Sequence, residues 1–110
     1  MADLNLVQDD TYPSRFQLKD ANGAVDLTNA TTIKLFLKSA SPSTLVTVTC
    51  TKDADQVGNK GWATASWGAT DLQTATNYDV EVQVTWSNGT KATFPTASPR
   101  SAIVRADLSD

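Results

Sequence analysis

The stretch Asn77-Tyr-Asp-Val-Glu-Val-Gln-Val-Thr-Trp86, followed by Ser87-Asn88-Gly89, decides the fold. Apolar and polar side chains alternate along it without a break, which is the period of a β-strand with one buried and one solvent-facing side. Asn-Gly is the strongest short hairpin signal, so the residues from Thr90 to Phe94 are expected to return as the partner strand. We expect the buried side of this hairpin to determine the fold through Tyr78, Val80, Val82, Trp86 and Phe94.

The same alternation recurs along the rest of the 110-residue chain and predicts strands rather than helices. Threonine is abundant and Glu81 is the only glutamate, a composition that favours strands over helices. Without helices to connect parallel strands, the strands are expected to pair antiparallel in two packed sheets. We therefore expect an all-β, immunoglobulin-like antiparallel β-sandwich of about seven or eight strands. The further strands are expected at Leu4 to Val7 (as an edge strand or an arm), Arg15 to Lys19, Ala24 to Leu27, Thr31 to Lys38, Leu45 to Thr51, Gly61 to Trp67 and Ser101 to Ala106.

Tyr78 stands at the start of the strongest strand, shortly after Asp71-Leu72. This position resembles the tyrosine corner of immunoglobulin-like sandwiches, in which the hydroxyl bonds back to the backbone a few residues upstream. An ordinary strand-start tyrosine is the alternative interpretation. Cys50 is the only cysteine, so the disulfide of antibody domains cannot form within the chain. Because Cys50 falls in a strand pattern, we expect it to act as a small buried hydrophobe.

The length is that of one domain, which we divide into an N-terminal arm or edge strand (1–13) and a single β-sandwich (14–110). No apolar run approaches the roughly 20 residues of a membrane span, and the N-terminus has neither the basic start nor the apolar core of a signal peptide. The net charge is −3, and the nine lysines and arginines are scattered. We therefore expect neither a membrane nor a nucleic acid as partner.

The chain contains no histidine, which removes the commonest general base and most zinc and copper sites. Asp79 and Glu81 stand two residues apart on one strand, as a glycosidase pair could, but a solvated strand face is the simpler interpretation. Asp53 and Asp55 begin a polar loop whose fifth position, Val57, is not a calcium ligand. We expect no catalytic residue, no metal and no cofactor, and therefore not an enzyme.

Exposed apolar side chains remain as candidates for function. Phe36 breaks the alternation of its strand on the outer side, and Trp62 lies on the opposite side of its strand from Trp67. Leu4 and Leu6 lie in the possible arm. We predict an interface that contains Leu4, Leu6, Phe36 and Trp62. An exposed tryptophan also stacks on sugars, so Trp62 carries the alternative of a carbohydrate-binding module.

The segment from Phe16-Gln-Leu-Lys-Asp20 through Gly23-Ala-Val-Asp26-Leu27-Thr28, then Ala30 to Leu37, resembles the opening of the N-terminal domain of phage baseplate upper proteins. The likeness covers roughly residues 14 to 106 in order and spacing. Its later positions are Gly61, Trp67, Asp71-Leu72, Tyr78 to Val82, Asn88-Gly89 and Phe94-Pro95. The resemblance implies an immunoglobulin-like virion structural domain. Baseplate upper proteins carry further domains after this one, whereas this sequence stops at Asp110, which leaves its place in the particle open.

The expected function is that of a non-enzymatic structural protein of a tailed-phage virion, in the tail, baseplate or neck, acting through protein–protein contacts. We expect it to be made in the host bacterial cytoplasm and to reside in the virion as a homo-oligomer beside other phage structural proteins. A capsid decoration protein is one alternative. A carbohydrate-binding module that holds a surface glycan during host attachment is the other.

Overall fold

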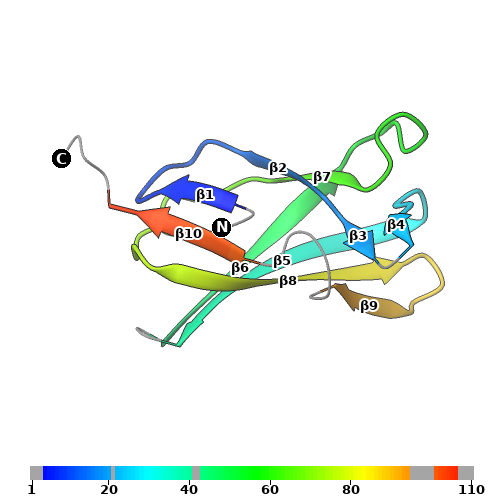
Figure 1. Ribbon diagram of the computed structural model, residues 1–110. Helices are drawn as coiled ribbons and strands as arrows, with labels where there is room; N and C mark the ends of the chain where they lie inside the picture. Colours follow the sequence, from blue (N-terminus) through cyan, green and yellow to red (C-terminus); the bar gives the residue numbers. More distant parts are fainter. Residues whose placement is uncertain (1–3, 21, 41–42, 95–100, 107–110) are drawn as a thin grey trace.

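The computed structural model describes residues 4–20, 22–40, 43–94 and 101–106, and over these ranges the chain is all-β (Figure 1). None of these residues forms a helix, so the described part contains no helix that could span a membrane. The strands are β1 (Leu4–Val7), β2 (Ser14–Gln17), β3 (Lys19–Asp20), β4 (Gly23–Ala24), β5 (Ala30–Ala40), β6 (Ser43–Lys52), β7 (Trp62–Ala65), β8 (Asn77–Trp86), β9 (Lys91–Phe94) and β10 (Ser101–Arg105).

Eight strands belong to one sheet, in the order β1-β10-β8-β5-β6-β7-β2, with β9 paired to β8 outside this path. β10 pairs with the first half of β8 and β9 with its second half, while β5 pairs with β8 over nearly its whole length. In Figure 1 the sheet folds over itself, with β5, β8 and β9 below and β1, β2, β7 and β10 above. The predicted fold class, an all-β sandwich of the immunoglobulin-like kind, is confirmed, but its two layers belong to one continuous sheet rather than to two separate sheets.

The core lies between the two layers and takes alternate residues from each strand. In β8 the inward side chains from Tyr78 to Val84 are at most 3% exposed, as the alternation predicts. Trp86 and Phe94 pack against the same core at its margin and are partly buried. The largest fully buried side chains include Leu18, Leu27, Leu35, Leu37 and Leu72. Burial of such side chains is the main source of stability in a domain of this size.

Tyr78 forms the predicted tyrosine corner. Its hydroxyl donates a hydrogen bond to the backbone oxygen of Thr74 at 2.8 Å, four residues upstream. The side chain is 3% exposed, and its burial raises the pKa of the Tyr78 phenol above its usual range. The bond fixes the backbone that leads into β8. It also distinguishes Tyr78 from an ordinary tyrosine at the start of a strand, which was the alternative interpretation.

The prediction of an entirely antiparallel sheet is wrong for one pair of strands. β1 runs parallel to β10, with Leu4 opposite Ala102 and Leu6 opposite Val104. A parallel pair needs a long connection, and here nearly the whole domain lies between the two strands. Leu4 and Leu6 are 7% and 8% exposed and belong to the core, so we withdraw both from the predicted interface. β1 stands at the edge of the sheet, and residues 1–3 lie outside the described ranges.

Gln56 is a buried amide that fastens the loop between β6 and β7 to the rest of the domain. Its Oε1 accepts hydrogen bonds from the backbone N–H of Leu27 (3.1 Å) and Gly61 (3.0 Å). Its Nε2 donates to the backbone oxygens of Asp53 (2.8 Å) and Trp62 (3.4 Å). One side chain therefore bonds to backbone groups from three separate parts of the chain.

Cys50 is buried on the inner side of β6, and desolvation raises the pKa of its thiol to about 12. Between pH 9 and 12 the unfolded chain releases this proton and the folded chain keeps it. We therefore expect the Cys50 thiol to lower the free energy of unfolding by up to about 1.4 kcal/mol per pH unit across this window, a contribution that Cys50→Ala removes. Urea unfolding of both proteins at pH 8 and pH 11 measures the difference. Equal pH dependence in the two proteins would contradict the buried thiol.

Candidate functional site

The structure places Phe36 and Trp62, the two remaining predicted interface residues, on different surfaces. Phe36 projects from the outer side of β5 and is half-buried. Trp62 begins β7, which lies two strands farther along the sheet than β5. Because the sheet folds over itself between these strands, we describe the two surfaces separately.

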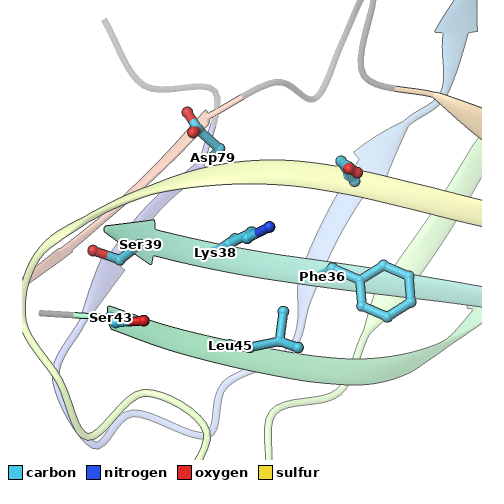
Figure 2. Close-up of a pocket in the computed structure, with 7 residues that line it drawn as sticks. Phe36, Lys38, Ser39, Ser43, Leu45 and Asp79 are labelled. Atoms are coloured by element: carbon cyan, nitrogen blue, oxygen red, sulfur yellow. The ribbon is translucent and has the colours of Figure 1, made fainter. Parts of the chain in front are cut away.

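A cavity of about 600 Å³ lies on the outer side of the long hairpin of β5 and β6, beside β8. Figure 2 shows Phe36 and Leu45 projecting from the neighbouring strands β5 and β6, with Lys38 beside Phe36 on β5 and Asp79 on the next strand. Leu45 is 64% exposed, which is unusual for a leucine in a regular strand. We call this surface the hairpin face. Its lining residues are Phe36, Lys38, Ser39, Ser43, Leu45, Asp79 and Glu81.

The strand register fixes which side chains of the hairpin face are neighbours. Lys38 stands opposite Asp79 on β8 and opposite Leu45 on β6. Phe36 stands opposite Glu81 on β8. The only ion pair within the described ranges joins Arg15 and Asp53, so the charged groups of the hairpin face are not paired with one another. The face thus combines apolar surface with charges that are free to meet a partner.

The surface around Trp62 is partly covered by Arg15 from the paired strand β2. The guanidinium carbon of Arg15 lies 4.2 Å from the centroid of the Trp62 ring, within the range of a cation–π contact. Arg15 Nη2 also contacts Asp53 Oδ2 at 2.5 Å, which holds the guanidinium in place. One face of the indole is therefore occupied within the chain, and Trp62 is half-buried rather than freely exposed.

The carboxylates of the loops accept hydrogen bonds from nearby backbone groups. Asp55 Oδ1 accepts from the N–H groups of Val57 and Gly58, both at 3.0 Å. Asp26 accepts from the Thr28 hydroxyl and N–H, which lowers the pKa of the Asp26 carboxyl below its usual range. Within the described ranges no three acidic, cysteine or histidine side chains gather as a metal site would require. These carboxylates stabilise turns.

Among the residues that the structure describes, three large exposed apolar side chains were not among the predicted interface residues. Leu45 could have been found, because the inward alternation of Val46 and its successors places it outward. Tyr12 (80% exposed) and Val57 (96% exposed) lie in loops, where no periodicity indicates direction. Leu45 alone of the three lies beside Phe36, so the hairpin face is the site that the structure assembles.

Comparison with known proteins adds no relative from which a role could be transferred. No family model, no curated protein and no solved structure matches the chain, and the hairpin face therefore stands as a candidate on its own geometry.

Proposed function

We propose that this chain is a non-enzymatic structural protein that works through protein–protein contacts made by the hairpin face. The observation that carries the proposal is the exposed Leu45 beside Phe36, on adjacent long strands of a sandwich. Strands held by a packed core keep these side chains in fixed positions, so little conformational entropy is lost when a partner binds. An apolar centre surrounded by unpaired charges has the composition of a protein interface.

The proposed setting is the particle of a tailed phage, in its tail, baseplate or neck, with capsid decoration as the alternative place. The support is the resemblance of residues 14 to 106 to the N-terminal domain of baseplate upper proteins, together with an all-β sandwich of the kind that this resemblance implies. In a particle, repeated copies would turn individually weak contacts into a stable assembly.

Incorporation into particles tests the proposal. Particles are purified on a density gradient from cells that produce the chain, and mass spectrometry counts its copies per particle. We expect a fixed copy number for the natural chain and a clear loss for Leu45→Asn, which removes exposed apolar surface at the hairpin face.

Val57→Asn is the matched control, because Val57 is also apolar and is even more exposed than Leu45 (96% against 64%) but lies on a loop away from the hairpin face. It should be incorporated like the natural chain. A chain that remains in the soluble fraction, with no copies in the particles, would contradict the virion assignment. Equal incorporation of both variants would contradict the role of the hairpin face.

The carbohydrate-binding alternative has less support. Stacking of a sugar needs an open aromatic face, and Arg15 covers one face of Trp62. Trp62 is also half-buried, which reduces the ring area that a ligand could reach. We therefore assign Trp62 and Arg15 first to the packing of β2 against β7.

A further inference from the structure

The charges on the outer side of β5 and β8, on and beside the hairpin face, are sorted by strand. The outward side chains of β5 include Lys34 and Lys38, and those of β8 include Asp79 and Glu81. All four are exposed, and no ion pair joins any of them within the described residues. The cations therefore lie on one strand and the anions on its neighbour, with Lys38 directly opposite Asp79. Glu81 stands opposite Phe36, and Lys34 stands opposite Gln83.

Such an arrangement is complementary to its own copy under one kind of symmetry. A two-fold axis that runs along the strands, midway between β5 and β8, exchanges the two strands. Lys38 of one copy then faces Asp79 of the other, while Lys34 faces Gln83 and Phe36 faces Glu81. An axis across the strands, or one centred on β5, would instead lay lysine upon lysine, and these like charges repel each other at an interface. Of these three placements of the axis, only the one along the strands between β5 and β8 avoids contact between lysines.

We propose that a second copy of this chain docks face to face on the hairpin face, with its two-fold axis along the strands between β5 and β8. Lys38 of each copy then meets Asp79 of the other, because these two residues stand at the same level of the register. Phe36 and Leu45 lie inside the contact and exclude water from it. This inference rests on the proposed function, since both assign the hairpin face to assembly.

The dimensions of the molecule suit such a pair. The molecule measures 43 × 25 × 25 Å. The area of a side along its long axis is therefore larger than the roughly 800 Å² that each partner contributes to a standard interface. Two twisted sheets pack face to face at about −30°, an angle that a two-fold axis close to the strand direction permits. The apolar residues supply affinity, and the charged residues supply orientation.

Two charge reversals test the pairing. Lys38→Glu and Asp79→Lys each replace both attractive contacts of the pair with repulsive ones. We expect either variant alone to raise the dimer dissociation constant about tenfold or more relative to the natural chain, measured by sedimentation equilibrium. Mixed in equal amounts, the two variants form a heterodimer in which both contacts are attractive again. Pull-down through an affinity tag on one variant detects it.

Lys19→Glu is the matched control, because it makes the same charge change on β3, outside the hairpin face. It should dimerise like the natural chain. Mixed with Asp79→Lys it restores only one of the two contacts, so this heterodimer should be weaker than the one formed by the two charge reversals. The double variant with both reversals in one chain restores every contact and should dimerise like the natural chain. Thermal unfolding of each variant shows that a loss of dimer is not a loss of fold.

Recovery in the mixture and in the double variant supports the two-fold pair. A natural chain that remains monomeric at concentrations near about 1 mM, where weak pairs form, overturns it. Dimers whose dissociation constant is unchanged by both charge reversals overturn it as well. In either of these cases the proposed function is judged separately, by incorporation into particles, because contacts with another virion protein would leave that result unchanged.

Discussion

Replacing Gly61 with alanine is expected to lower the free energy of unfolding by about 3 kcal/mol or more. Gly61 has a φ of +84°, where a residue with a Cβ is strained. The added Cβ would also lie 2.7 Å from the backbone oxygen of Leu18, closer than van der Waals contact allows. A backbone oxygen cannot move aside as a flexible side chain can, so the chain around β7 must shift.

Gly89 provides the matched control. Its φ is +87°, nearly the same as that of Gly61, but a Cβ there would meet nothing within 4 Å. Gly89→Ala should therefore show the backbone strain alone, about 1–2 kcal/mol. Urea unfolding of both variants measures the difference. Equal losses would mean that the close approach to Leu18 contributes nothing.

Replacing Gln56 with leucine is expected to cost about 2–4 kcal/mol, because it leaves buried backbone donors without acceptors. The N–H groups of Leu27 and Gly61 both bond to Gln56 Oε1 in buried surroundings. Leucine fills a similar volume, so the loss reports the hydrogen bonds rather than a cavity. Hydrogen exchange should become faster at these two amides before it does so in β8.

The control for this change is Gln17→Leu. Gln17 Nε2 donates to the backbone oxygen of Lys60 at 2.9 Å in an exposed position, where water can replace it. A cost of only a few tenths of a kcal/mol is expected there. If the two glutamine variants lost the same stability, the burial of Gln56 would not be the cause.

Local patterns were sufficient to predict the central hairpin. β8 spans Asn77–Trp86, as the alternation predicted, because an apolar face every second residue and an Asn-Gly turn act within a dozen residues. The tyrosine corner was also predictable, since the partner of Tyr78 is only four residues away. Features whose partners lie within about a dozen residues in the sequence can be predicted without knowledge of the rest of the chain.

Features that depend on distant partners were missed. Leu4 and Leu6 are buried by β10, which lies at the other end of the sequence. Gln56 appeared to belong to a polar loop because its acceptor role toward Leu27 spans 29 residues. Trp62 points outward as predicted, but its covering residue, Arg15, comes from another strand. Whether a side chain points inward or outward follows from its position within its own strand. Whether another residue covers that side chain depends on which strands are neighbours in the assembled sheet.

The candidate site lies between these two cases. The break in alternation at Phe36 identified one residue of the hairpin face. The arrangement of lysines on β5 beside carboxylates on β8 became visible only with the register, because these strands are separated by β6 and β7 in the sequence. A pattern of charges across strands requires knowing which strands are neighbours.

The parallel pairing of β1 with β10 has a mechanical consequence. Tension applied at Leu4 and Arg105 would pull the two strands along each other in opposite directions, because both run the same way (Figure 1). In that shear geometry the hydrogen bonds of the pair bear the load together. An antiparallel pair loaded at its shared end would instead open one bond at a time, like a zipper. The pair of β1 and β10, at one edge of this sheet, therefore acts as a clamp along the line of the chain.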